Sequence, residues 1–308
     1  MNKYNIITEL KRVEDKHSLL LIKKLSERSG FFCNEDKLIF IDRDITHLQN
    51  EIIETEYLKL ETHVKIKGVK NFQTFKDDYY NLIIFKAEIS NDNIYDFINL
   101  CNIYAQNIDE LVFKEFFYSL ISIFQLPSEK KYINAIGLYG ELKLMQYFAK
   151  KYKIDLSVFW HRKGPLSLYD FSIKNHYIEV KSNANGTEIA TIKHKQLFDV
   201  ADGFLAFVSA NINDVGETIE EVISSMQDDR YFFDNLNFNI NITKELKRIS
   251  NDDYKEKRFK LKRIGMYSTE AINPFLTMPD GVSDLIYKLD LSDYEEIKNE
   301  EEVAALFE

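Results

Sequence analysis

The chain has 308 residues, of which 45% are hydrophobic and 14% aromatic, so it can bury a large core and is not a disordered protein. Its net charge of −10 argues against a general DNA-coating protein, and its two cysteines, Cys33 and Cys101, form no CxxC pair and no disulfide framework. The sequence shows no secretion signal, no apolar run of roughly 18 residues and no P-loop motif. We therefore expect a cytoplasmic protein that neither crosses a membrane nor binds ATP through a P-loop.

Residues 1–126 predict an α+β lobe. Two apolar runs, 31–33 and 38–41, flank a polar turn and indicate a β-hairpin. Hydrophobic and polar residues alternate over residues 58–67, which predicts a half-buried strand. The lobe is completed by a partner strand at residues 79–89 and by helices at residues 93–107 and 110–125.

Leu126-Pro127-Ser128 marks the boundary to a second domain, residues 127–308, with Ser128 as a candidate N-cap. The elements expected there are a helix to about Tyr152, strands at 156–160, 168–173, 176–182 and 187–192, a helix from Lys193 to about Ala201 and a buried strand at 203–210. Helices near 217–227 and 243–249 follow, then strands near 258–267 and 283–289 and an acidic tail.

Three residues in the middle of this domain carry candidate chemistry: Asp170, Glu179 and Lys181. Glu179 and Lys181 point to the same side of a strand because side chains alternate with period two. A short turn at Lys174-Asn175 would fold the segment of Asp170 back beside Glu179. Two carboxylates could then hold a divalent ion that polarises a phosphate and activates a water, while the lysine orients that water or offsets the phosphate charge.

Two further residues fit the same site. Glu141 shares the inward face of its predicted helix with apolar residues, and burying an unpaired carboxylate costs several kcal/mol, roughly, unless a cation meets it. Gln196 lies at the start of the next helix, where its amide could face the same cleft. Taken singly, each residue has an ordinary interpretation: a solvated Glu-x-Lys strand, a turn aspartate, a helical glutamate paired with lysine and a surface amide. The six histidines show no HxxxH or Cys/His spacing, which disfavours a zinc site.

At these residues the sequence resembles the PD-(D/E)XK nuclease superfamily, in the DUF4420-like branch associated with bacterial restriction and phage-defence loci. The matching segments are Gly137-Leu-Tyr-Gly-Glu141-Leu, Asp170-Phe, Ile178-Glu179-Val180-Lys181-Ser182, Gln196-Leu197 and a terminal strand within residues 281–289. Tyr169 stands where the name-giving proline would be. The resemblance is specific over residues 136–210.

The resemblance implies an α+β (or α/β) fold with a restriction-endonuclease-like αβββαβ core, which the N-terminal lobe and a C-terminal extension packed on the core would complete. It implies Asp170 and Glu179 as metal ligands, the Val180 carbonyl as a further ligand and Lys181 as the catalytic lysine. Glu141, also a candidate metal ligand, and Gln196 would be accessory site residues. The ion would be Mg²⁺ or Mn²⁺.

Charge is segregated along the chain. Residues 141–195 contain ten Lys/Arg and five Asp/Glu, residues 244–263 contain nine and four, and residues 290–308 contain one and eight. A basic centre with an acidic tail suits a protein that approaches phosphates at one face, although each basic stretch could equally be ordinary solvated surface. The expected DNA contacts are Arg162, Lys163, Lys193 and Lys195.

The sequence thus predicts a Mg²⁺-dependent DNA endonuclease, or nuclease subunit, of a restriction or phage-defence system. Further subunits such as a motor ATPase or methyltransferase are the expected partners, and a homodimer stays open. The N-terminal lobe would contact the target or a partner. The alternatives are a catalytically inactive, nuclease-like DNA-binding or scaffold subunit, which has no need for converging buried charges, and an RNA-directed nuclease, which no RNA-binding signature supports.

Overall fold

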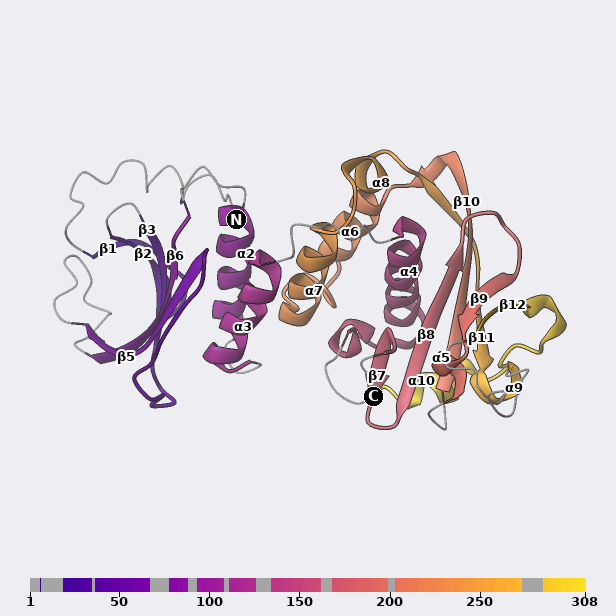
Figure 1. The fold of residues 1–308 in the computed structure, drawn as a ribbon, viewed down its shortest axis with the longest axis horizontal. Helices are drawn as coiled ribbons and strands as arrows, with labels where there is room; N and C mark the ends of the chain where they lie inside the picture. Colours follow the sequence, from indigo (N-terminus) through magenta and orange to yellow (C-terminus); the bar gives the residue numbers. More distant parts are fainter. Residues whose placement is uncertain are drawn as a thin grey trace. The chain divides into compact units, whose positions relative to one another are not determined.

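A computed structural model of the chain describes residue 6 and residues 19–34, 37–66, 78–87, 93–107, 111–125, 134–161, 168–198, 203–272 and 285–308. The chain divides into two compact units, Met1–Lys130 (unit 1) and Lys131–Glu308 (unit 2). The boundary predicted at Leu126-Pro127-Ser128 lies outside the described residues. Both units mix helices and strands, so the predicted α+β class is confirmed (Figure 1).

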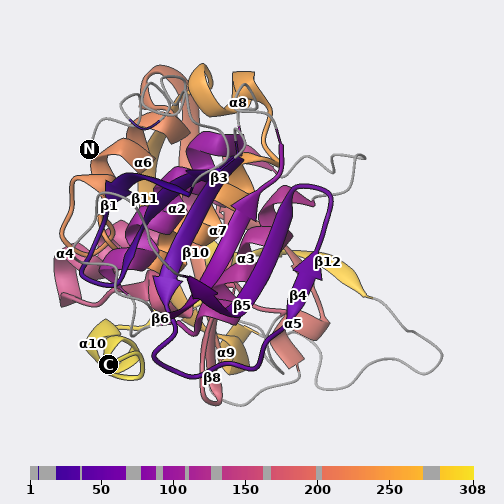
Figure 2. The same ribbon diagram turned by 90° about the vertical axis from the view of Figure 1, so that its left-hand side faces the viewer.

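Unit 1 is a six-stranded antiparallel sheet in the order β1-β2-β3-β6-β5-β4, with two helices on one face (Figures 1 and 2). Its elements are β1 (Leu20–Lys24), β2 (Ser29–Asn34), β3 (Lys37–Arg43), β4 (Ile52–Glu54), β5 (Leu58–Ile66), β6 (Asp78–Phe85), α2 (Asn93–Gln106) and α3 (Phe113–Phe124). Aromatic rings join the sheet to the helices: Phe40 of β3 packs against Tyr104 of α2 and Phe113 of α3. The predicted hairpin is present as β2 and β3, whereas the short edge strands β1 and β4 were not predicted.

Unit 2 holds the core that the sequence predicts. Its elements are α4 (Ala135–Tyr152), η1 (Leu156–Phe159), β7 (Phe171–Ile173), β8 (His176–Asn183), β9 (Ile189–Lys193), α5 (Lys195–Phe198), β10 (Gly203–Glu217), α6 (Ile219–Gln227), α7 (Leu236–Leu246), α8 (Asn251–Lys255), β11 (Phe259–Ser268), α9 (Thr269–Ile272), β12 (Ile286–Asp290), η2 (Leu291–Asp293) and α10 (Glu300–Ala305). The order α4-β7-β8-β9-α5-β10 is the expected αβββαβ order.

The main sheet of unit 2 runs β11-β10-β8-β7. β8 and β10 are parallel, as a crossover between them requires, and the outer pairs are antiparallel. β9 pairs instead with the late strand β12, which ties the C-terminal extension to the core.

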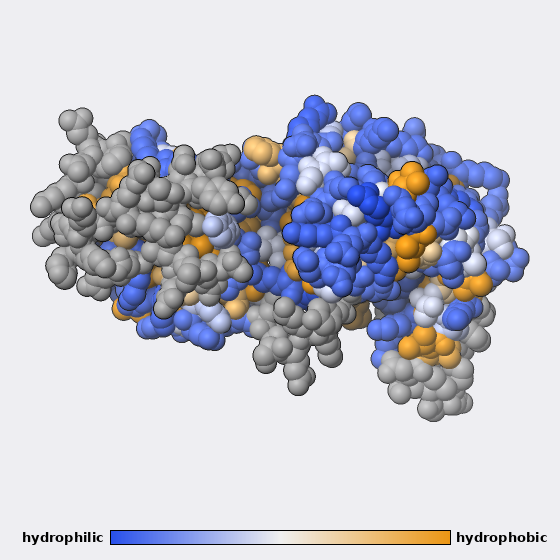
Figure 3. Space-filling model, turned by 90° about the horizontal axis from the view of Figure 1, so that it is seen from above, coloured by the Kyte–Doolittle hydropathy of each residue, from blue (hydrophilic) through white to orange (hydrophobic). Residues whose placement is uncertain are grey.

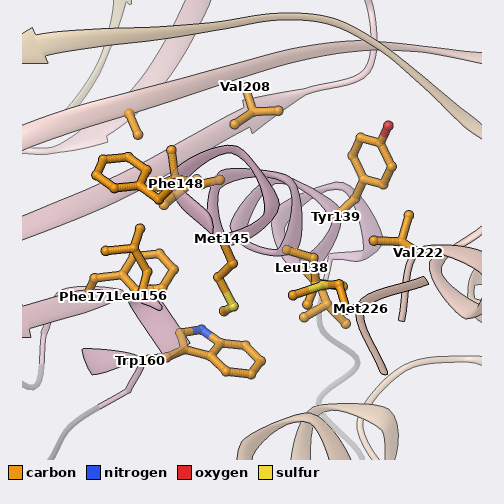
Figure 4. Packing of buried hydrophobic residues seen from close by; sticks show 14 of the residues in the cluster. Leu138, Tyr139, Met145, Phe148, Leu156, Trp160, Phe171, Val208, Val222 and Met226 are labelled. Atoms are coloured by element: carbon orange, nitrogen blue, oxygen red, sulfur yellow. The ribbon is translucent and has the colours of Figure 1, made fainter. Parts of the chain in front are cut away.

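Helix α4 packs on this sheet and carries the first site residue. Its apolar face, which includes Leu138, Leu142 and Met145, is buried among residues of the sheet and of α6 (Figure 4). The close approach depends on Gly140, where a Cβ would overlap Ser182 Oγ of β8. The residue after this glycine, Glu141, is thereby held beside the strands.

Two predicted strands of unit 2 are wrong in part. The strand expected at residues 156–160 is a 3₁₀-helix, η1, because the Asp155 side chain accepts hydrogen bonds from Ser157 N at 2.8 Å and Ser157 Oγ at 2.6 Å and tightens the turn. The strand expected at residues 168–173 begins only at Phe171, and residues 168–170 form a turn and bend.

The predicted helix from Lys193 to about Ala201 is also shorter than expected. Lys193 ends β9, α5 spans Lys195–Phe198, and residues 199–202 lie outside the described part of the chain.

The acidic tail packs on unit 2. Val303 and Phe307 enter its core, and the Glu300 carboxylate accepts hydrogen bonds from Lys151 Nζ at 2.7 Å, from Tyr152 Oη at 2.5 Å and from the Tyr147 hydroxyl. The tail is therefore anchored at the C-terminal end of α4. Among the described residues, no helix has both the length and the apolar character that a membrane span needs.

Candidate active site

The β7–β8 hairpin places Asp170 beside Glu179. Phe171 pairs with Ile178 and Ile173 with His176, so the register brings the residue before Phe171 next to the residue after Ile178. The connecting turn needs a left-handed residue, and Lys174 supplies it with φ 51°. Asp170 Oδ2 then accepts a hydrogen bond of 2.8 Å from the backbone N–H of Val180, which fixes the carboxylate at the end of the hairpin.

Glu179 is the centre of a buried polar cluster. It is only 2% exposed, and its Oε1 accepts hydrogen bonds from the Lys181 ammonium and, at 2.6 Å, from Gln196 Nε2. Its other oxygen, Oε2, is buried and has no hydrogen-bond partner among the described residues. A buried anionic oxygen without a donor is costly, and a bound cation would satisfy it.

Glu141 reaches the same site from α4. Its Oε2 accepts a hydrogen bond of 2.6 Å from Trp160 Nε1 and lies 3.4 Å from His161 Nε2. Ligand atoms of Glu141, His161 and Asp170 lie within 4.8 Å of one another. The five predicted residues, Glu141, Asp170, Glu179, Lys181 and Gln196, are thus gathered by α4, the β7–β8 hairpin and α5.

His161 was not predicted as a site residue. It forms no histidine pair of metal-binding spacing and stands alone in the sequence between Trp160 and the predicted DNA contact Arg162. Its position directly after a predicted strand, next to two basic residues, was the one signal that could have found it. Its partners come from distant segments and cannot be read from local spacing.

Burial and like charges dominate the electrostatics. The pKa of Asp170 is raised well above its usual range, first by burial and then by the charges of Glu141 and Glu179. Burial also raises the pKa of Glu179, against the opposing charge of Lys181. Burial alone would lower the pKa of His161, but the Glu141 and Glu245 carboxylates outweigh it and raise that pKa. The site therefore concentrates negative charge in a poorly solvated place.

The predicted DNA contacts are placed only in part. Arg162 and Lys163 lie outside the described residues. Lys193 is exposed at the end of β9, close enough to Glu179 for its charge to counter the rise in the pKa of that carboxyl. Lys195 is the first, exposed residue of α5. Because α5 has only one turn, its N-terminus contributes little dipole that could attract phosphate.

The donor set fits a hard divalent ion. Mg²⁺ and Mn²⁺ take carboxylate oxygens, and Asp170, Glu179 and Glu141 offer them from three segments, with the orphaned Glu179 Oε2 among them. The roles of these residues, and that of the Val180 carbonyl as a ligand, remain predictions.

Comparison with known proteins gives one match. The DUF4420 family, described as "Putative PD-(D/E)XK family member", matches residues 124–292, which is more than half of the chain and includes every described site residue. Neither a curated protein nor a solved structure matches the chain. The chain belongs to the DUF4420 family and, with it, to the PD-(D/E)XK superfamily.

Proposed function

We propose that the protein is a metal-dependent DNA endonuclease, or the nuclease subunit, of a bacterial restriction or phage-defence system. Membership of a PD-(D/E)XK family points to a nuclease. The observation that carries the rest is the buried Glu179 carboxylate beside that of Asp170. One of its oxygens accepts a hydrogen bond from Lys181, and the other has no donor in the part of the chain that the structure describes.

Each candidate site residue would have its own role in phosphodiester hydrolysis. Asp170, Glu179 and Glu141 would hold the ion, with the Val180 carbonyl as a further ligand; a bound Mg²⁺ or Mn²⁺ polarises the phosphate and supports the attacking water. The Lys181 ammonium, fixed by Glu179, would orient that water and offset charge on the phosphate in the transition state. Gln196 and Trp160 hold Glu179 and Glu141 in place through their N–H groups.

The DNA would approach along the basic segment that flanks this site, with Lys193 and Lys195 as described contacts and Arg162 and Lys163 as further ones. Unit 1 would contact the target or a partner. A motor ATPase or a methyltransferase would suit such a subunit, and so would a second copy of this chain. The defence role is proposed from the family resemblance alone.

The test is cleavage of duplex DNA, single-stranded DNA and RNA by the purified full chain, alone and with the products of neighbouring genes. We expect DNA cleavage in Mg²⁺ or Mn²⁺, its loss on chelation and its loss in Lys181→Met, which keeps the length of the side chain but not the charge. Inactivity in every mixture, together with no metal binding by calorimetry, would establish the scaffold alternative. Cleavage of RNA alone would refute the DNA assignment.

A further inference from the structure

The His161 imidazole faces carboxylates from three elements. Its Nε2 lies 3.4 Å from Glu141 Oε2 on α4 and 4.0 Å from Glu245 Oε1 on α7, and it shares the 4.8 Å ligand group with Asp170. Within the described residues, no other group of histidine, cysteine and acidic side chains has this spacing.

These carboxylates have other donors at shorter range. Glu141 Oε2 accepts a hydrogen bond of 2.6 Å from the Trp160 indole N–H, and Asp170 Oδ2 accepts one from the Val180 N–H. Each oxygen of the Glu245 carboxylate accepts a hydrogen bond of 3.1 Å from Arg248 Nη1. The imidazole is therefore not needed to satisfy them, and it contacts none of them at the 2.7–3.0 Å of a strong charge-assisted hydrogen bond.

The spacing matches ligands of one ion. With metal–ligand bonds of about 2.1 Å, neighbouring ligand atoms lie roughly 3.0–3.4 Å apart and opposite ones about 4.2 Å apart. The 3.4 Å between His161 Nε2 and Glu141 Oε2 falls in this range, and the 4.8 Å bound on the group that includes Asp170 is compatible with it. Glu179 belongs to the same charged cluster, since its charge acts on Asp170, and its buried Oε2 has no hydrogen-bond partner among the residues that the structure describes.

The backbone conformation at His161 places its imidazole beside these carboxylates. Its φ is 49°, a left-handed conformation that is uncommon for a residue other than glycine. Two hydrogen bonds enforce it, from the His161 N–H to the Asp170 carbonyl at 2.9 Å and from Asn241 Nδ2 of α7 to the Trp160 carbonyl at 2.9 Å. The imidazole is thus held by the same segment that presents Asp170.

We propose that His161 is a nitrogen ligand of a divalent cation that it shares with Glu141 and Asp170, and that the site consequently favours Mn²⁺ over Mg²⁺. Imidazole suits first-row transition metals, whereas Mg²⁺ prefers oxygen ligands and retains its water. This inference rests on the metal site of the proposed function, and it adds a ligand and a choice of ion to it.

The test is electron spin-echo envelope modulation of Mn²⁺ bound to the full chain, which detects a coordinated imidazole nitrogen without any cleavage. We expect nitrogen modulation in the wild type, its loss in His161→Asn and its retention in the control variant His176→Asn, which removes an imidazole at the far end of β8. By calorimetry, His161→Asn should weaken Mn²⁺ binding about tenfold or more and change Mg²⁺ binding much less.

The outcomes separate this inference from the proposed function. Bound Mn²⁺ without nitrogen modulation in the wild type, or with modulation that survives in His161→Asn, refutes the role of His161 and leaves the nuclease proposal standing. A wild-type chain that binds no Mn²⁺ refutes both. If His161→Asn does not fold, ¹⁵N-histidine labelling of the wild-type chain decides the matter, since an unchanged modulation pattern excludes a histidine ligand.

Discussion

Glu179 and Asp170 illustrate the conflict between stability and function at the scale of single residues. Both carboxylates are held in place by donors, yet burial and mutual repulsion disfavour their charged forms. In our proposal, these charges are retained for the ion that they bind rather than for what they contribute to folding.

Asp170→Asn should therefore separate activity from stability. The amide oxygen can still accept the Val180 N–H, but the negative charge beside Glu141 is gone. We expect the rate of cleavage to fall by a few orders of magnitude and the urea midpoint of the metal-free chain to stay unchanged or rise.

The pH dependence of stability should change as well. The pKa of Asp170 in the folded state lies above its unfolded value, so the wild-type chain should lose stability as pH rises above the usual aspartate range, and the variant should lose less. Cleavage by the Asp170→Asn variant at the wild-type rate would contradict the role of Asp170 as a metal ligand.

A second buried aspartate makes an independent prediction in unit 1. Burial raises the pKa of Asp42 to about 6, although Arg28 hydrogen-bonds both of its oxygens at 3.1 and 3.3 Å and opposes the shift. The folded state therefore binds a proton that the unfolded chain releases near pH 4, and this contribution to stability is lost as pH rises from about 4 to 6.

The expected loss over the whole range is on the order of 3 kcal/mol, because the pKa rises from 3.8 to about 6 and each pKa unit corresponds to about 1.4 kcal/mol. Hydrogen exchange of the amides of β3 and β6 at pH 4.5 and pH 7 measures it, after correction for the intrinsic pH dependence of exchange. Asp42→Asn should reduce the difference between the two pH values. An equal difference in the variant and the wild type would place the titration elsewhere.

At the scale of elements, α4 provides a matched pair of glycines. A Cβ at Gly140 would overlap Ser182 Oγ and lie 3.0 Å from Ser182 Cβ, whereas a Cβ at Gly137 would meet nothing within 4 Å. Gly140→Ala should push the helix from β8 and cost about 1–3 kcal/mol. Gly137→Ala should stabilise the helix by about 0.5–1 kcal/mol.

The two substitutions also differ in their effect on the site. Glu141 follows Gly140, so a displaced helix should weaken metal binding in Gly140→Ala, and Gly137→Ala should leave it unchanged. Urea unfolding and calorimetric Mn²⁺ titration of both variants measure the two effects. Equal stability of the two variants would show that the close contact of α4 with β8 does not matter.

The same elements show what the sequence could predict. The hairpin that joins Asp170 to Glu179 and the helix of Glu141 follow from local period and turn chemistry, and both are present. The prediction of a strand at residues 156–160 was wrong. Its residues favour β-structure, but the Asp155 side chain accepts a hydrogen bond from the Ser157 N–H and stabilises a 3₁₀ turn instead.

His161 was missed because its partners are non-local, and its place after a predicted strand was only a weak signal. These partners lie on α4, on the segment before β7 and on α7, and α7 begins at Leu236, seven residues before the helix expected there. Without that longer helix, the contacts of Asn241 and Glu245 with the Trp160-His161 segment were not foreseeable from the sequence.

At the scale of the whole molecule, the described candidate site residues all lie in unit 2. In our proposal, unit 1 contacts the target or a partner. Seen from above, the described surface of unit 2 is mostly hydrophilic, with small scattered hydrophobic groups (Figure 3). In our proposal, a chain of net charge −10 binds DNA through local basic groups rather than through its overall charge.

Charge reversal tests where those groups are. Lys193→Glu with Lys195→Glu should weaken binding to all DNA sequences alike and flatten the salt dependence by about 0.9 in log–log slope for each phosphate that the variant no longer neutralises. Lys298→Glu is the control, because Lys298 is 85% exposed in the acidic tail. Binding isotherms of the metal-free chain between about 50 and 200 mM salt measure both quantities. If the double variant and the control bind alike, the DNA lies elsewhere, with residues 244–263 as the next candidate.

The most direct measurement of the central claim is anomalous diffraction from a crystal of the full chain soaked with Mn²⁺. We predict a manganese peak bonded to carboxylate oxygens of both Asp170 and Glu179, with Glu141 in the same site, and no peak there in Asp170→Asn crystals soaked in the same way. A well-ordered wild-type site without manganese, or manganese bound only away from these carboxylates, would contradict the account of this protein as a metal-dependent nuclease.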